Sequence, residues 1–172
     1  MPEALLIGGR SGVGKTTVGW EVSGLLGEAG IAHCHVEGDT VGNVVPPPAD
    51  DPHRSRITEV NLTAMWANFA AIGCTRLVYT NTASVLEPEM FERALGGSAR
   101  LTRVMLTAAD ETVAGRLGGR EIGSELELHL KRSAFMAPYL DEHVPAGTIR
   151  IATDGRTVTE IARDVIAATG WG

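Results

Sequence analysis

The sequence predicts an α/β fold in which a parallel five-stranded sheet is covered by helices on both faces. Strand and helix signals alternate along the 172 residues, and a glycine-rich phosphate-loop motif joins the first strand to the first helix. Parallel strands need crossover connections, which are usually helical, so this alternation favours βαβ units. No internal repeat or low-complexity linker divides the chain, and we expect one domain over residues 1–172.

The first elements lie on either side of the glycine-rich loop. An apolar run at residues 3–8 predicts a short buried strand, and apolar residues recur at helical spacing over residues 18–26. Gly27 and Gly30 are stop signals for that helix. A second strand is expected over residues 32–37.

A proline-rich loop separates the second strand from the next helix. Three consecutive prolines, residues 46–48, exclude regular structure from Gly42 to Asp51. A helix is predicted over residues 52–72, because apolar side chains recur on one of its faces and Gly73 follows it. The third strand is expected over residues 76–81.

The C-terminal half continues the alternation. We expect a short helix over residues 88–95, a strand over residues 101–106 and a strand over residues 148–152. Asp110 and Glu111 lie where the first turn of a helix favours negative charge.

Two further segments complete the pattern. Residues 126–137 fit a strand by the alternation of three leucines and a helix by their longer apolar period. We predict a helix, because the pattern continues past the length of a strand. A capping box, Thr157 followed three residues later by Glu160, predicts the start of the last helix.

The phosphate loop is a complete GxxxxGK[ST] motif from Gly9 to Thr16, and its Lys15 is one of only two lysines beside thirteen arginines. Backbone N–H groups of such a loop and the following helix start bind phosphate. The compact Lys15 ammonium suits the β- and γ-phosphates of ATP, and the Thr16 hydroxyl suits Mg²⁺. The alternative is an ordinary glycine-rich turn. The loop residues expected to contact the nucleotide are Gly9, Arg10, Ser11, Gly12, Val13, Gly14, Lys15, Thr16 and Thr17.

Polar residues follow the carboxyl ends of the strands, where ligands of open α/β sheets bind. Asp39 follows the second strand, and Thr80 and Asn81 close the third. Asp39 could orient the waters of Mg²⁺, accept a proton from a substrate hydroxyl, or be a simple turn residue. We assign Asp39 to catalysis, metal and substrate, and Thr80 and Asn81 to substrate binding.

The loop over residues 40–56 is expected to help form a site for the phosphoryl acceptor, because it leaves the end of the second strand. Arg54 and Arg56 lie in it. They could hold an anionic acceptor such as a carboxylate or phosphate, or be solvated at the start of a helix.

Composition excludes several function classes. The net charge of −6 and the absence of a Lys/Arg cluster argue against a nucleic-acid surface. No apolar run approaches the roughly 18 residues of a membrane span, and the N-terminus lacks the pattern of a secretion signal. We therefore expect a cytoplasmic protein. Cys34 and Cys74 lack a metal-binding spacing and are interpreted as buried free thiols.

Three segments together resemble the small P-loop kinases, which include gluconate, shikimate and adenylylsulfate kinases and the chloramphenicol phosphotransferases. They are the phosphate loop, the Glu37-Gly38-Asp39 strand end and the Arg116 to Arg120 segment. The resemblance implies a three-layer P-loop fold with sheet order 2-3-1-4-5 and a short mobile lid at about residues 117–132. It also implies transfer of the ATP γ-phosphoryl group to a hydroxyl of a small molecule.

The resemblance further implies roles for two arginines and one turn. Arg116 and Arg120 would be lid arginines, one near the adenine or its phosphates and one neutralising the transferring phosphoryl group. The alternative is a pair of solvated arginines on one helix face. The turn after the fifth strand would flank the adenine. Its residues assigned to the nucleotide are Asp154, Gly155 and Arg156.

The sequence also departs from the family patterns. Adenylylsulfate kinases continue their Gly-Asp pair with Asn and a later Arg, where this chain has Thr40 and Gly42, so that substrate is not favoured. The third strand ends without the aspartate of a Walker B segment, so orientation of the metal is left to Thr16 and Asp39. The guanine signature Asn-Lys-x-Asp is absent, which favours ATP over GTP.

Two function classes remain open from the sequence. The first is a kinase that phosphorylates a small molecule. The second is a nucleotide-binding ATPase or switch protein that acts on a protein partner, with hydrolysis independent of any small acceptor. The acceptor and the oligomeric state are left open.

Overall fold

The sheet is built around its first strand, β1 (Glu3–Gly8), in the computed structural model of the chain, which describes residues 1–120 and 124–171. Of residues 120, 124–126, 128 and 129 only the backbone is described. Strand β1 pairs in parallel with β3 (Arg76–Thr80) on one side and with β4 (Arg100–Thr107) on the other. The outer strands are β2 (Cys34–Glu37) beside β3 and β5 (Ile149–Ala152) beside β4.

All four strand pairings are parallel, and the strand order is β2-β3-β1-β4-β5. The predicted parallel sheet and its implied order are therefore confirmed. The carboxyl ends of all five strands lie at one edge of such a sheet, so the residues that follow them share one side of the molecule.

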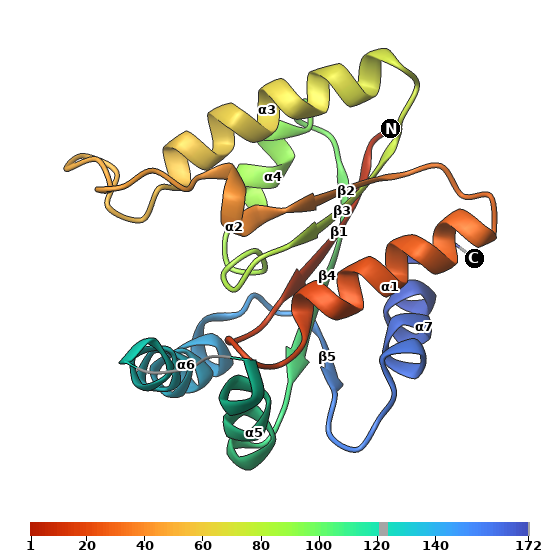
Figure 1. Ribbon diagram of the computed structural model, residues 1–172. Helices are drawn as coiled ribbons and strands as arrows, with labels where there is room; N and C mark the ends of the chain where they lie inside the picture. Colours follow the sequence, from red (N-terminus) through yellow and green to blue (C-terminus); the bar gives the residue numbers. More distant parts are fainter. Residues whose placement is uncertain (121–123, 172) are drawn as a thin grey trace.

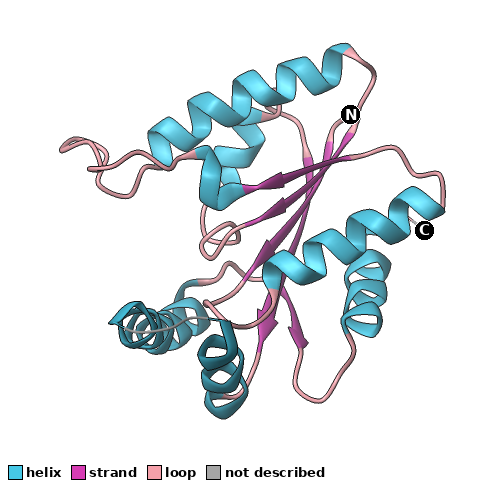
Figure 2. Ribbon diagram, in the orientation of Figure 1, coloured by secondary structure: helices cyan, strands magenta, loops and turns pink. Residues whose placement is uncertain are grey.

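Helices cover both faces of the sheet, as Figure 1 and Figure 2 show. On one face pack α1 (Lys15–Glu28), α5 (Asp110–Arg120) and α7 (Val158–Thr169). On the other pack α3 (Ser55–Ala71), α4 (Pro88–Ala94) and α6 (Ser124–His143). The three layers expected of the fold are present.

Strand β1 supplies both halves of the core because successive side chains of a strand point to opposite faces. Leu5 and Ile7 belong to the apolar cluster under α1 and α7, whereas Ala4 and Leu6 belong to the cluster under α3 and α4. All four are fully buried, with 0% exposure. An apolar run without alternation is therefore what a central strand buried on both faces requires.

Some element boundaries differ from those predicted. Strand β2 begins at Cys34 and not at Ala32, and α3 begins at Ser55 and not at Pro52. A one-turn helix, α2 (Gly38–Val41), was not predicted because four residues carry no helical period. The helix expected over residues 126–137 is confirmed as part of α6, and the capping box of α7 is confirmed at Thr157 and Glu160.

Cys34 and Cys74 are free thiols, as predicted, but only Cys34 is buried and Cys74 is partly exposed. Their sulfur atoms lie 3.5 and 3.3 Å from the same carbonyl oxygen, that of Arg76. Burial, aided by the neighbouring Cys74, raises the pKa of the Cys34 thiol to about 12, so Cys34 stays protonated at neutral pH. Within the part of the chain that the structure describes, none of the helices combines the length and the hydropathy needed to cross a bilayer.

Candidate active site

The phosphate loop reverses the chain between β1 and α1, and its glycines are required by that geometry. Gly9, Gly12 and Gly14 have φ angles of 131°, 87° and 101°, a region that side chains disfavour. A Cβ on Gly9 would also lie 2.5 Å from the Leu106 carbonyl oxygen. The glycines therefore allow the loop to pass close to β4 and to end at the start of α1.

Helix α1 presents backbone N–H groups to the space in front of the loop. Gly14 is the N-cap, and the amide of Val18 is bonded to the Gly14 carbonyl at 2.9 Å. The amides of residues 15–17 therefore precede the first intrahelical bond. Such amides, with the positive end of the helix dipole, form an anion site.

A cavity of about 270 Å³ opens at this helix start. The Lys15 ammonium donates to the Arg10 carbonyl oxygen at 3.1 Å, which holds the lysine over its own loop. Six of the nine predicted loop residues line the cavity. The lining residues are Ser11, Gly12, Gly14, Lys15, Thr16, Thr17, Asp39, Thr82, Arg116 and Leu117.

The side chain of Arg10 points elsewhere. Its guanidinium donates to the Ala108 carbonyl oxygen at 2.8 Å and pairs with the Asp110 carboxylate at 2.6 Å. Arg10 is 7% exposed and ties the loop to the segment between β4 and α5. Its side chain thus has a structural partner, and a nucleotide contact of Arg10 would come from the backbone.

Two carboxylates lie near the phosphate loop, Asp39 as a lining residue of the cavity and Glu37 through a hydrogen bond from Thr16. Glu37, at the end of β2, accepts a hydrogen bond from the Thr16 hydroxyl to its Oε2 atom over 3.3 Å. Its Oε1 atom is buried without a hydrogen-bond partner among the described residues. Asp39, two residues later, accepts a hydrogen bond from the Asn81 amide over 2.7 Å. A hydroxyl and two carboxylates are the oxygen ligands that Mg²⁺ prefers, so these residues fit that metal.

Sequence reasoning assigned Asp39 and Thr16 to this site but missed Glu37. A glutamate that ends a strand looks like any polar residue of an alternating strand. The feature that could have identified Glu37 in the sequence is its position two residues before Asp39. His35, which precedes Glu37 by two residues in β2, has its Nε2 atom 3.7 Å from Glu37 Oε1. Burial lowers the pKa of His35, and the Glu37 carboxylate opposes that effect, so burial favours the neutral imidazole beside Glu37.

Arg116 lies on α5 and is tied to two other segments. Its Nη1 atom donates to the Val13 carbonyl oxygen at 3.1 Å and to the Thr153 hydroxyl at 2.9 Å, and its Nη2 atom donates to the Thr153 carbonyl oxygen at 3.1 Å. Arg116 therefore bridges the phosphate loop and the end of β5 while lining the smaller cavity.

The other predicted lid features are only partly covered by the structure. Arg120 is the last residue of α5, and its side chain lies outside the described residues. The predicted lid at residues 117–132 spans the end of α5 and the start of α6 and includes residues 121–123, which also lie outside them. The lid and the role of Arg120 stay predictions.

The turn after β5 has partners of its own. The Asp154 carboxylate accepts the Ala109 amide at 3.0 and 3.2 Å, just before α5. A hydrogen bond from the Thr112 side chain and this amide lower the pKa of Asp154. Gly155 has a φ of 65°, and Arg156 pairs with Asp164 at 2.7 Å. The contact of this turn with adenine stays a prediction.

A second and larger cavity of about 670 Å³ lies beyond Asp39. Its walls come from α2, the start of α3, the segment after β3, α4 and α6. The lining residues are Gly38, Asp39, Gly42, Asn43, His53, Arg54, Ser55, Thr58, Tyr79, Asn81, Ala83, Ser84, Leu86, Glu87, Met90, Phe91, Phe135, Met136 and Tyr139. Asp39 lines both cavities, so the two cavities adjoin at this residue.

The residues predicted to bind the acceptor divide into two groups. Asp39, Arg54 and Asn81 line the larger cavity. Arg56 instead pairs with Asp50 at 2.8 Å, with both side chains exposed. Thr80 is 1% exposed, and its methyl group would be 2.5 Å from a Cβ on Gly19, so it is buried against α1.

Comparison with known proteins places the fold among small kinases. No protein-family model and no curated protein sequence matches the chain. A gluconokinase from Sinorhizobium meliloti 1021 is similar in structure, with a TM-score of 0.59 and 18% identity over 98% of this chain and 92% of that one. A tunicamycin resistance protein from Deinococcus radiodurans is similar as well, with a TM-score of 0.61 and 18% identity over 99% of this chain and 96% of that one.

A shikimate kinase from Bacteroides thetaiotaomicron is also similar, with a TM-score of 0.62 and 13% identity over 96% of both chains. Identities this low establish the shape of the chain but not its substrate. The chain therefore has the fold of the small P-loop kinases, as the sequence resemblance implied.

Proposed function

We propose that this protein is an ATP-dependent phosphotransferase that moves the γ-phosphoryl group to a hydroxyl of a small molecule. The observation that carries the proposal is the meeting of two cavities at Asp39. One has the phosphate loop as a wall, and the other is large enough for a separate molecule. A transfer reaction needs two adjoining sites of this kind.

The nucleotide phosphates bind at the start of α1 in this proposal. The amides of residues 15–17 and the Lys15 ammonium supply positive charge there. Arg116 adds a guanidinium whose position is fixed by Val13 and Thr153. Groups held in place before the reaction stabilise developing charge without further reorganisation.

The metal side of the site is formed by Thr16, Glu37 and Asp39. The Thr16 hydroxyl would ligate Mg²⁺, and the two carboxylates would hold its waters. Mg²⁺ bound there would supply positive charge to the β- and γ-phosphates. The hydrogen bond between Thr16 and Glu37 shows that these oxygen atoms already face each other.

The acceptor hydroxyl would lie in the larger cavity beside Asp39. As its oxygen forms a bond to the γ-phosphorus, the bond from that phosphorus to the β–γ bridging oxygen breaks, and ADP leaves. The hydroxyl proton passes to the Asp39 carboxylate. Asn81 holds that carboxylate through its 2.7 Å hydrogen bond to the Oδ1 atom.

The test is a turnover assay with Mg-ATP and a panel of small alcohols, with phosphoryl transfer followed by ³¹P NMR. We expect at least one alcohol to be phosphorylated, and we expect Lys15→Ala to abolish turnover. If no alcohol is phosphorylated, calorimetry with Mg-ATP shows whether ATP binding or only phosphoryl transfer is absent. If ATP binds and is hydrolysed at a rate that no alcohol changes, the switch or ATPase alternative is supported. If ATP does not bind, both functions are wrong.

A further inference from the structure

The larger cavity has an aromatic lining from two layers of the fold. Tyr79 of β3 and Phe91 of α4 contact each other edge to face, with ring centres 4.8 Å apart, and both are 2% exposed or less. On the opposite wall Phe135 and Tyr139 of α6 stack with ring centres 6.2 Å apart. These last two rings are 69% and 40% exposed. Large apolar side chains that line a cavity and remain this exposed are typical of a ligand site.

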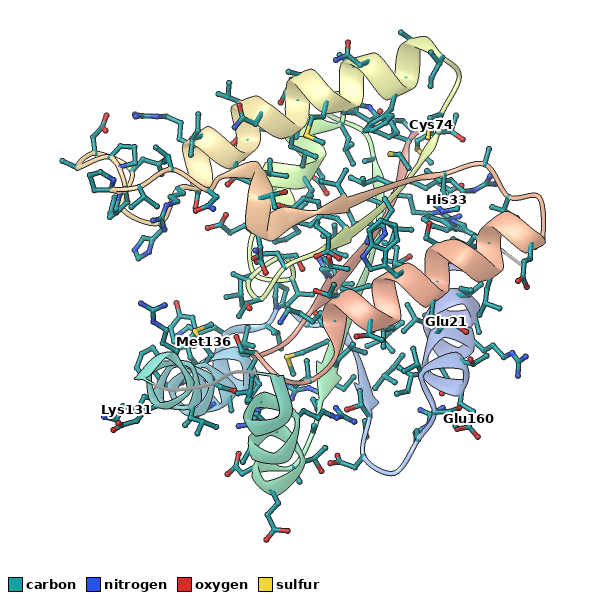
Figure 3. All side chains as sticks on the ribbon, in the orientation of Figure 1. Glu21, His33, Cys74, Lys131, Met136 and Glu160 are labelled. Atoms are coloured by element: carbon teal, nitrogen blue, oxygen red, sulfur yellow. The ribbon has the colours of Figure 1, made fainter. Side chains whose placement is uncertain are left out.

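Figure 3 shows two labelled side chains of α6 that project in different directions. Met136 projects from the side of α6 that faces α2 and the loop after it, whereas Lys131 projects from the opposite side. Met136 lines the cavity, and the Lys131 side chain is 72% exposed. Phe135, Met136 and Tyr139 of α6 therefore line the site, and Lys131 faces solvent.

The charges around the cavity are unfavourable for an anionic acceptor. Asp39 and Glu87 contribute carboxylates, and Arg54 is the only Lys or Arg among the described lining residues. The Arg54 Nε atom already donates to the Val44 carbonyl oxygen at 2.9 Å. Sites for carboxylate or phosphate ligands usually bring several cationic donors together.

Both carboxylates also act on Tyr79, another residue that lines the cavity. Burial raises the pKa of Tyr79, and the carboxylates of Asp39 and Glu87 raise it further. A carboxylate or phosphate on the acceptor would meet these two charges in a partly enclosed site, where repulsion is screened less than in water.

We infer that the acceptor is an alcohol that carries an aromatic or extended apolar group and no negative charge. Its hydroxyl end lies at Asp39, and its apolar part lies against the rings of α4 and α6. The volume of about 670 Å³ suits a molecule of this size. The inference rests on the proposed function for the role of the hydroxyl, but the choice of ligand follows from the cavity walls alone.

Two matched ligands test the inference. Both 3-phenoxypropane-1,2-diol and glycerate present a terminal hydroxymethyl group next to a secondary alcohol, and they differ in carrying a phenoxymethyl group or a carboxylate. Their affinities are measured by calorimetry with Mg²⁺ and a non-hydrolysable ATP analogue present. We expect the phenoxy diol to bind at least about tenfold more tightly than glycerate.

A pair of variants locates the binding. Phe135→Ala is expected to weaken the phenoxy diol about fivefold or more while leaving the affinity for the ATP analogue unchanged. The control is Ile72→Ala, because Ile72 is an exposed apolar residue, 81% exposed, at the end of α3. This control is expected to leave both affinities unchanged.

The two proposals fail separately. If the phenoxy diol binds no more tightly than glycerate, the acceptor class is wrong, whether or not phosphoryl transfer occurs. The same holds if Phe135→Ala and Ile72→Ala behave alike. If the phenoxy diol binds as expected but neither it nor any other alcohol is phosphorylated, the proposed function is wrong and the ligand class of the cavity stands.

Discussion

Asn81 and Asp39 are joined by a hydrogen bond of 2.7 Å from the Asn81 amide to the Asp39 Oδ1 atom. The bond links the end of β3 to α2 at the point where the two cavities meet. Asp39→Asn keeps the shape of the side chain but removes its basicity. We expect kcat to fall about 10²- to 10⁴-fold, measured with Mg-ATP and a saturating acceptor, while the affinity for ATP stays near normal.

Asn81→Ala is the companion variant, because it removes the orienting bond and leaves the carboxylate. Its kcat should fall less than that of Asp39→Asn. If Asp39→Asn turns over like the unmodified protein, both the proton-acceptor and the metal role of Asp39 are wrong.

Glu37→Gln tests the carboxylate beside Thr16. The amide keeps a hydrogen-bond acceptor for the 3.3 Å contact but loses the negative charge that would attract a cation. We expect the Mg²⁺ concentration for half-maximal turnover to rise about tenfold or more, as read from a magnesium titration at fixed ATP. The control is Glu28→Gln at the exposed end of α1. Equal magnesium dependence in the two variants would contradict the assignment.

Arg116 holds Thr153 and the phosphate loop at once, and we propose that it also contributes to turnover. Arg116→Ala leaves the hydroxyl and carbonyl of Thr153, a residue with 0% exposure, without this donor. The free energy of unfolding should fall by about 1–3 kcal/mol, as measured by urea unfolding. Turnover should fall more than ATP affinity does.

Arg116→Lys separates charge from geometry in the same experiment. A lysine keeps the charge but cannot supply the planar pair of donors, so it should restore turnover only in part. Arg163→Ala, on the exposed face of α7, is the control for loss of an arginine. A stability loss no greater than that of the control argues against the bridge.

Two glycines of α1 form an internal comparison. A Cβ on Gly19 would lie 2.5 Å from the Thr80 methyl group and 3.0 Å from His35 Nε2, whereas one on Gly24 would have no neighbour within 4 Å. Gly24→Ala should stabilise the protein by about 0.5–1 kcal/mol, because alanine favours a helix interior. Gly19→Ala should destabilise it by about 1–3 kcal/mol through overpacking. Urea unfolding that ranks the two variants the other way would show that α1 does not pack on β3 as described.

Local patterns were enough to predict the sheet and the phosphate loop. Strand β1 is an uninterrupted apolar run because both of its faces are buried, and Gly9 and Gly14 are needed for positive φ angles. The strand order could not come from periodicity, which does not encode neighbours in space. It came from the resemblance to the small P-loop kinases, and the pairing of β1 with β3 and β4 confirms it.

The lining of the larger cavity could not be predicted residue by residue. Arg54 and Arg56 are equivalent in sequence, but Arg54 takes a left-handed backbone, with a φ of 60°, at the start of α3 and lines the cavity. Phe135 and Tyr139 were not singled out in the sequence, because they line a site only together with residues of α2 and α4, which are distant in the chain.

The shared position of Asp39 also bears on inhibitor design. Because Asp39 lines both cavities, a single compound that tethers a nucleotide analogue to an aryl alcohol by a short linker would span the junction if the two cavities bind as proposed. Its second half would then bind from an effective concentration in the millimolar range, which raises avidity about 10²- to 10⁴-fold over either half alone.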